Sequence, residues 1–146
     1  MRKVVVAIDG SDASKSVVDY AIYYANREKD AAMMFLHVIS FAEHETVFYG
    51  KGAIVLPPSE DEVRGRFEKF IKERTDKAGM SIPGMSVHVR QGNAYEEIIR
   101  FAAEKDADII MIGHRGLSGL ERFFLGSVAA KVVSHAPCSV YVHRPK

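Results

Sequence analysis

Cysteine is nearly absent from this chain: Cys138 is the single thiol among 146 residues. An intrachain disulfide is therefore excluded, and the composition is compatible with a reducing compartment, so we expect a cytoplasmic protein. A large charge of one sign is also missing, because the formal net charge is only +1. This balance gives no electrostatic argument for a nucleic acid or an anionic membrane as a partner. No apolar run reaches the ~18 residues that a membrane-spanning helix requires.

What is present is typical of an ordinary globular protein. Apolar residues make up 47% of the chain and charged residues 27%, a balance that supplies a hydrophobic core and a solvated surface. The length favours one domain that covers residues 1–146. The apolar residues 4–8 follow Met-Arg-Lys without a small-residue cleavage site, so they indicate a strand rather than a signal peptide.

Five segments of the chain are predicted to be β-strands. Residues 4–8, 33–39 and 109–112 are apolar throughout, as expected for strands that are buried on both faces. Residues 87–90 and 140–143 alternate between apolar and polar side chains, as expected for strands with one solvated face.

Helices are predicted between these strands, from apolar side chains at three-and-four spacing. The second helix begins with a capping box at Ser59, and the third begins near Asn93. The fourth covers residues 127–135 and ends before Pro137. Residues 40–58, which include prolines and glycines, are predicted to be a long connection.

The alternation of strands and helices predicts an α/β fold with a doubly wound, five-stranded parallel sheet and helices on both faces. The apolar strands should be central and the alternating strands should be edges, which the strand order 3-2-1-4-5 satisfies. In that order the winding changes direction between the first and the fourth strand. Ligands bind at such a switch point, outside the carboxyl ends of the strands. Asp9-Gly10 and residues 113–116 follow those two strands.

A glycine pattern lies at this predicted switch point. Gly113 and Gly116 follow the fourth strand, and Gly126-Ser127 begin the last helix. Glycine permits positive φ and the close approach of a ligand, and free N–H groups at a helix start attract anions. The pattern therefore predicts a phosphate-binding loop; the alternative is that the glycines only shape a surface turn. The P-loop pattern and the dinucleotide fingerprint are both absent from the sequence.

Two charged side chains accompany the glycines. Arg115 lies between the first two glycines, where its guanidinium could bind phosphate oxygens in a bidentate manner. Asp9 ends the first strand at the same edge, where its carboxylate could accept a ribose hydroxyl or bind Mg²⁺. The alternative role for Asp9 is to cap the first helix.

The spacing Gly-x-x-Gly, nine residues, Gly-Ser resembles the motif of the ATP-binding branch of the universal stress protein family. The resemblance runs nearly from end to end of the chain and includes residues 4–11, 36–38 and 136–140. It implies a fold similar to that of the adenine nucleotide α-hydrolases, a bound ATP (or ADP or AMP) with Mg²⁺, and a homodimer. Asp9 would be the candidate Mg²⁺ ligand. The residues that the resemblance implies for nucleotide binding are Ala7, Ile8, Asp9, Val38, Ile112, Gly113, His114, Arg115, Gly116, Gly126, Ser127 and Val128. Ala129 stands where family members often carry serine or threonine, so one phosphate contact is expected to be missing.

For the other residues that could be catalytic or metal-binding, structural roles are favoured. The histidines show no helical metal-ligand spacing, so a structural or solvated role is favoured over zinc. Ser127 lacks the Gly-x-Ser-x-Gly elbow of a nucleophile, and no catalytic residue is predicted. The last strand would leave unpaired backbone groups at the edge of the sheet. Pairing with a second copy through Val140, Tyr141 and Val142 would satisfy them.

The favoured function is an adenine-nucleotide-binding stress-response or regulatory protein, in which the nucleotide acts as a switch for residues 40–58, residues 114–125 or the dimer surface. Two alternatives stay open: a slow ATPase or nucleotide-processing enzyme, and a nucleotide-free dimeric interaction module. A Gly113→Val substitution is expected to abolish nucleotide binding while leaving the fold intact.

Overall fold

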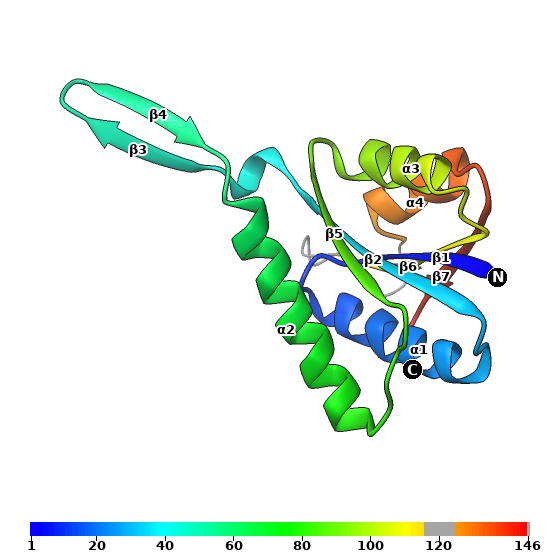
Figure 1. Cartoon of the computed structure of the whole chain (residues 1–146). Helices are drawn as coiled ribbons and strands as arrows, with labels where there is room; N and C mark the ends of the chain where they lie inside the picture. The colour runs from blue at the N-terminus through cyan, green and yellow to red at the C-terminus, as the bar shows by residue number, and fades with distance from the viewer. Residues whose placement is uncertain (116–124, 146) are drawn as a thin grey trace.

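The computed structural model describes residues 1–115 and 125–145 of the chain. Strands and helices alternate along most of it (Figure 1). In chain order the elements are β1 (Arg2–Ala7), α1 (Asp12–Arg27), β2 (Ala31–Ile39), the 3₁₀ helix η1 (Phe41–Glu43), β3 (Glu45–Tyr49), β4 (Gly52–Leu56), α2 (Glu60–Ala78), β5 (Ser86–Gln91), α3 (Ala94–Glu104), β6 (Ile109–Gly113), α4 (Ser127–His135) and β7 (Ser139–His143).

Five of these strands form one parallel sheet in the order β5-β2-β1-β6-β7. This order confirms the predicted 3-2-1-4-5 pattern, with β5 and β7 as the edge strands. β1 lies at the centre, and its register sets Val4 opposite Met33 of β2 on one side and Ile109 of β6 on the other. The chain therefore winds outward in both directions from the gap between β1 and β6.

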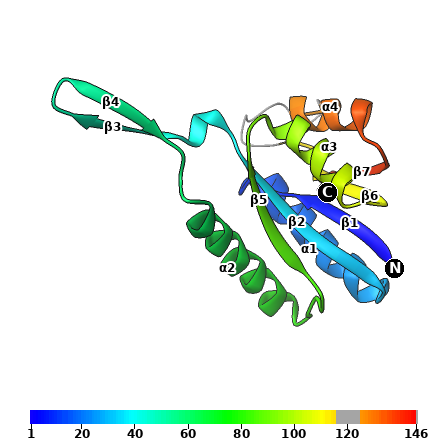
Figure 2. The same ribbon diagram turned by 45° about the horizontal axis from the view of Figure 1, so that its top comes forward.

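Helices cover both faces of the sheet, α1 and α2 on one and α3 and α4 on the other (Figure 2). Successive side chains of β1 point to opposite faces of the sheet, as in any β-strand. Val4 and Val6 pack with α1 and α2, whereas Val5 and Ala7 pack with α3 and α4. A strand that is buried on both faces has no polar side to present, which accounts for the unbroken apolar run in the sequence.

Side chains cap the starts of the first three helices. Ser11 Oγ accepts the N–H of Ser14 at the start of α1, and Ser59 does the same for α2. Asn93 caps α3, as predicted from the sequence. Gly10 precedes the first of these caps with φ of +83°, a conformation that favours glycine.

The segment predicted to be a plain connection instead contains an antiparallel hairpin, β3–β4. This hairpin arm (residues 45–56) projects away from the rest of the molecule, as Figures 1 and 2 show. Gly50, with φ of +52°, and Lys51 form its two-residue turn. Val47-Phe48-Tyr49 and Ala53–Leu56 on either side are strand-forming residues, so the sequence does contain a hairpin signal. The prolines at the base of the arm, which are typical of loops, led to the prediction of a connection instead of this hairpin.

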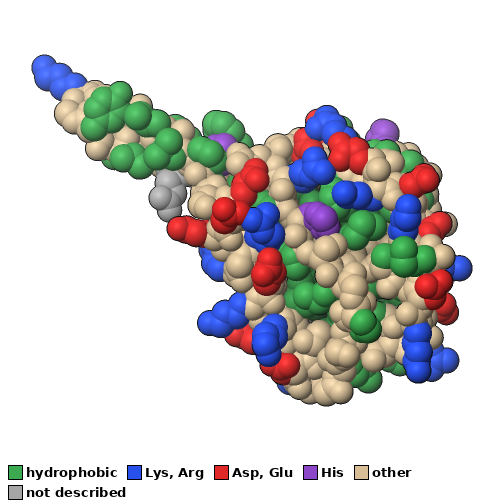
Figure 3. Space-filling view, viewed as in Figure 1, with side chains coloured by type: hydrophobic (Ala, Val, Ile, Leu, Met, Phe, Trp, Pro, Cys, Tyr) green, Lys and Arg blue, Asp and Glu red, His purple; other side chains and the backbone are tan. Residues whose placement is uncertain are grey.

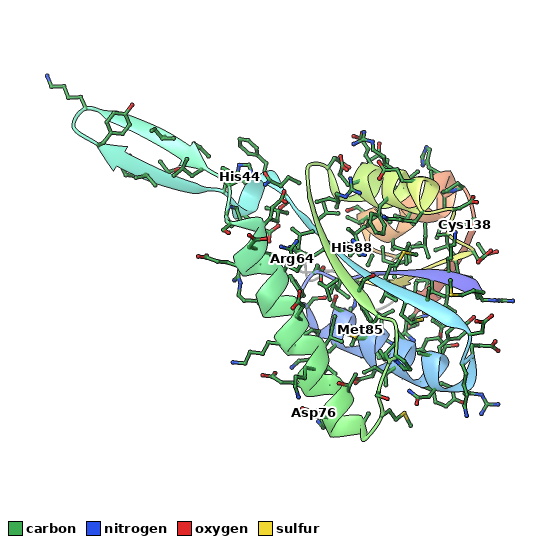
Figure 4. All side chains as sticks on the ribbon, viewed as in Figure 1. His44, Arg64, Asp76, Met85, His88 and Cys138 are labelled. Atoms are coloured by element: carbon green, nitrogen blue, oxygen red, sulfur yellow. The ribbon has the colours of Figure 1, made fainter. Side chains whose placement is uncertain are left out.

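His88 is a half-buried titratable group on β5. Its Nε2 lies 2.8 Å from Ser86 Oγ, and its ring packs on Phe101. Burial and the nearby charges of Lys105, Arg90 and Arg64 lower the pKa of His88 below its ordinary value. Figure 4 shows His88 on β5 with Arg64 of α2 nearby.

Acidification should therefore destabilise the fold through His88. A lowered pKa means that the unfolded chain binds the proton more readily, so stability is lost as the pH falls below ~6.5 and towards the lowered value. Urea midpoints at pH 7.5 and pH 5.5 measure this loss, which the His88→Gln variant should reduce. An unchanged loss in the variant would contradict the assignment.

Candidate functional site

A pocket of about 210 Å³ opens at the carboxyl ends of the central strands, where the sheet changes its direction of winding. This volume exceeds the space that one or two water molecules fill and suits part of a small organic ligand. Strands β1, β2 and β6 form its floor, and the starts of α3 and α4 form its walls. Its lining residues are Ala7, Ile8, Asp9, Ser14, Leu36, Val38, Ala94, Ile98, Ile112, Gly113, Arg115, Gly126, Ser127, Val128 and Ala129.

Asp9 is fixed at the rim of this pocket by the turn that leads into α1. Its Oδ1 accepts the N–H of Ser11 at 2.9 Å, and its own N–H donates to Ser14 Oγ at 2.7 Å. Ser11, and not Asp9, caps α1. Among the described residues none donates to Oδ2, so this oxygen is available to a ligand hydroxyl or a cation.

The start of α4 lacks the side-chain cap that the other three helices have. Its N-cap is Gly126, which has no side chain to accept the N–H groups of the first turn. Residues 126–129 all line the pocket. Uncapped N–H groups and the positive end of the helix dipole attract an anion, by ~0.3–1 kcal/mol per charge for the dipole alone.

The two described glycines of the motif are not there to supply positive φ. Gly126 has φ of −60°, which any residue adopts, and Gly113 is not among the described residues with positive φ. At Gly113 an added Cβ would lie 3.2 Å from both the Cβ and the carbonyl oxygen of Ala13. Gly113 therefore allows the end of β6 to pack against α1.

This contact corrects one expectation. A valine at position 113 would press on the backbone of Ala13, so we expect Gly113→Val to cost stability as well as any affinity for a ligand, and it is no clean test of ligand binding.

His114 and Arg115 continue the chain beyond β6 and differ in their relation to the pocket. Arg115 lines it and brings a positive charge, whereas His114 does not line it. Instead, the backbone of His114 joins two segments: its N–H donates to His143, and its carbonyl accepts the N–H of Gly126. Burial, together with the charges of Arg144 and Arg115, lowers the pKa of His114. The predicted site residue Gly116 lies outside the described residues.

Of the residues expected at a nucleotide site, the pocket brings together ten: Ala7, Ile8, Asp9, Val38, Ile112, Gly113, Arg115, Gly126, Ser127 and Val128. Their role in binding stays a prediction. Sequence reasoning missed Ser14, Leu36, Ala94 and Ile98 as lining residues, and it named Ala129, which also lines the pocket, only as the position of a missing phosphate contact. Leu36 and Val38 share one face of β2, so the period of two could have found Leu36. Ala94 and Ile98 are four apart at the start of a helix, and only the packing of α3 on the sheet brings them here.

His37 connects Ile8, the residue that follows β1, to the base of the hairpin arm. This buried imidazole of β2 has Nδ1 2.8 Å from the carbonyl oxygen of Ile8 and Nε2 3.1 Å from Glu43 Oε1. The other carboxylate oxygen of Glu43 accepts the N–H of Ser40, and the ring of His37 stacks on Phe67. A continuous set of polar contacts thus runs from a pocket residue to η1.

The described part of the chain contains no group of three or more His, Cys, Asp or Glu side chains that could hold a metal ion. At the pocket, Asp9 supplies the carboxylate, and a cation there would need further ligands from a bound molecule. Within the same residues no helix has the length and apolar character to cross a membrane.

The fold and the pocket define a doubly wound parallel α/β protein with a ligand-sized site at its switch point. The sequence profile of the universal stress protein family matches residues 1–144. The chain belongs to this family, as the motif predicted. The chain is 33% identical over 148 residues to universal stress protein YxiE of Bacillus subtilis, covering 98% of this chain and 99% of the relative.

Further relatives agree with this assignment. Universal stress protein MJ0531 of Methanocaldococcus jannaschii is 32% identical over 147 residues, covering 99% of this chain and 84% of that protein. The solved structure of the universal stress protein UspA from Lactobacillus plantarum has a TM-score of 0.73 at 24% identity, covering 98% of this chain and 97% of that one. The similarity to the UspA structure supports the assignment of the fold.

The packing of Gly113 predicts that alanine at this position lowers the stability of the fold, and a second glycine offers a control in which the same substitution should raise it. Gly113→Ala should destabilise the fold by ~1–3 kcal/mol, because the new methyl group presses on Ala13. Gly65→Ala, in α2, meets open space and should stabilise by ~0.5–1 kcal/mol, because alanine favours a helix. Urea unfolding measures both, and a neutral Gly113→Ala would show that β6 and α1 have room to spare.

Proposed function

We propose that this protein binds an adenine nucleotide in the switch-point pocket and acts as a nucleotide-dependent stress-response or regulatory protein. The observation that carries the proposal is the start of α4, where a glycine N-cap leaves the first-turn N–H groups uncapped at the wall of a ligand-sized pocket. Such a helix start suits a phosphate group.

The chemistry of the pocket changes along its length in the way a nucleotide requires. Apolar side chains, among them Leu36, Val38 and Ile98, suit the faces of a base. Asp9 at the rim suits a ribose hydroxyl, and Arg115 with the start of α4 suits phosphate oxygens. The base would lie between β2 and α3, and the phosphates would extend towards α4.

Two solved universal stress proteins support the choice of ligand by analogy. One is described as a complex with cAMP, at a TM-score of 0.68 and 23% identity. Another, from Archaeoglobus fulgidus, is described as a complex with dAMP, at a TM-score of 0.62 and 23% identity. These ligands belong to those proteins. They make an adenine nucleotide the first ligand to test here.

We propose a holding role rather than efficient catalysis. The titratable groups among the described pocket residues are Asp9 and Arg115, and Asp9 already accepts a backbone N–H. If Mg²⁺ accompanies the nucleotide, Asp9 would hold it, and the ion would neutralise phosphate charge. Asp9 would in either case orient the ribose side of the ligand.

We also propose that β7 forms a homodimer through its outer edge. β7 is an edge strand of the sheet, and Val140, Tyr141 and Val142 on it are half-buried. Pairing with a second copy would satisfy its outward backbone groups.

We further propose that nucleotide occupancy is transmitted to the hairpin arm through His37. The imidazole contacts the carbonyl oxygen of Ile8, a residue that lines the pocket. It also contacts the carboxylate of Glu43, the last residue of η1, which lies two residues before the start of β3. A ligand that displaces the backbone at Ile8 changes the position of this ring. The change would then reach η1 and β3.

Nucleotide binding is tested by a matched pair of substitutions on α3. Ala94→Leu adds bulk inside the pocket and should weaken the binding of ATP at least ~10-fold, which corresponds to ~1.4 kcal/mol. Ala103→Leu makes the same change on the same helix at an exposed position and should leave the affinity unchanged. Titration calorimetry with ATP, ADP and AMP, each with and without Mg²⁺, measures the affinities. No binding to the unaltered protein, or equal affinity in both variants, would refute the proposed site.

Transmission to the arm is tested by hydrogen exchange. ATP should change the exchange rates of the amides in residues 45–56 at least ~2-fold. Amides exchange when the arm opens locally, and the frequency of opening depends on how firmly η1 holds the base of the arm. Glu43→Ala, which removes the contact with His37, should abolish this change while retaining ATP affinity. His44→Ala, at the neighbouring residue, is the control and should preserve it. A ligand effect that survives in the Glu43→Ala chain would rule out this route.

A further inference from the structure

The hairpin arm exposes apolar side chains on both of its faces. Residues directly opposite each other in an antiparallel pair lie on the same face, so Val47 and Ile54 share one face and Phe48 and Ala53 the other. Figure 3 shows the apolar surface of the projecting arm. Its exposed large apolar side chains are Val47 (42%), Phe48 (79%), Tyr49 (59%), Ile54 (44%), Val55 (50%) and Leu56 (46%).

Such an arm needs a covering partner. A two-stranded hairpin alone is only marginally stable in water, and it gains stability when further strands extend it or when a surface covers it. The arm lies outside both of the hydrophobic cores that flank the sheet. Its apolar content therefore contributes little to the fold of the single chain.

The outer edge of β4 is open to another strand. Tyr49 and Gly52 flank the two-residue turn, so the carbonyl of Tyr49 and the N–H of Gly52 face each other. Hydrogen-bonded and non-hydrogen-bonded pairs alternate along an antiparallel ladder. The backbone groups of Ala53 and Val55 therefore point away from β3. Moreover, β4 contains neither a charged residue nor a proline, the usual devices that keep an edge strand from pairing.

We infer that β4 pairs with β4 of a second copy of this chain, antiparallel, about a two-fold axis at Ile54. In this register Ala53 lies opposite Val55 of the partner subunit, and the outward N–H and C=O groups of the two residues meet. The two-fold axis generates a second, identical pair, in which Val55 lies opposite Ala53 of the partner subunit. Each pair exchanges two hydrogen bonds, which gives about four new backbone hydrogen bonds in all. The two arms become one four-stranded sheet, the size at which a sheet with apolar faces is stable.

Charge complementarity supports a second copy as the occupant. The antiparallel register brings the tip of each arm to the base of the other. The tip carries Lys51, and the base leads into the first turn of α2, which carries Glu60, Asp61 and Glu62. A positive tip thus meets a negative base twice in the symmetric dimer. The surface is separate from the edge of β7 and does not depend on a bound nucleotide.

Disulfide cross-linking tests this pairing. Ile54→Cys is introduced in a Cys138→Ser chain, which removes the native thiol on the side of the molecule away from the arm (Figure 4). In the inferred dimer the two copies of residue 54 form a non-hydrogen-bonded pair with Cα atoms ~4.5 Å apart, a separation that a disulfide spans. Val47→Cys in the same background is the matched control. It lies on the same face with nearly equal exposure, 42% against 44%, but three strand spacings, ~14 Å, would separate it from its own copy.

Under a mild oxidant at low micromolar protein, the Ile54→Cys chain should form covalent dimers at least ~10-fold faster than the Val47→Cys chain, because the reaction requires Cα atoms within reach. Adding Lys51→Glu should slow the Ile54→Cys reaction, and high salt should reduce that effect. Equal rates for the two cysteine variants, or no cross-linking at position 54, would overturn the inference. Either outcome is expected if the chain forms a dimer only through β7. Either is also expected if the apolar arm binds a different protein instead of a second copy of this chain.

Discussion

The parallel pairing of β1 along both of its edges is the interaction on which the rest of the structure depends. Val4, Val5 and Val6 are fully buried, so this strand contributes to both hydrophobic cores at once. β2 and β6 flank it on opposite sides. After β1 the chain runs through α1 towards β2, whereas after β6 it runs through α4 towards β7, so the two connections diverge and leave a gap between the carboxyl ends of β1 and β6. The pocket is a consequence of this divergence. The polar groups at its rim then decide what it can hold.

Much of this architecture was predictable because the sheet is parallel and buried. Unbroken apolar runs such as residues 109–112 have few alternatives to a central strand, and the alternating runs identify the edges. The helix starts at Ser59 and Asn93 were predictable for a local reason, since a capping side chain bonds an N–H only a few residues away. Family membership was predictable from the spacing of the glycines, which the family profile then matched.

The remainder depends on contacts that no local pattern encodes. Ser14 reaches Asp9 only because Gly10 turns the chain with positive φ before α1 begins. The glycine at position 113 was attributed to the ligand, whereas a Cβ at this position would lie only 3.2 Å from Ala13, a hundred residues away in the sequence. Residues 40–58 were interpreted through their prolines and glycines, which conceal the strand-forming residues between them. In each case the deciding partner is brought close by tertiary packing.

The glycine cap of α4 has a consequence for the lifetime of the protein as well as for its ligand. A helix that begins at a glycine lacks the side-chain hydrogen bond that caps the other three helices, at a cost of a few tenths of a kcal/mol. An anion that binds there raises the stability of the whole fold by an amount that grows with the logarithm of its concentration. Because proteases act on the opened chain, such binding also lowers the rate of degradation. If an anion binds at this helix start, the cellular abundance of the protein would follow the supply of that anion.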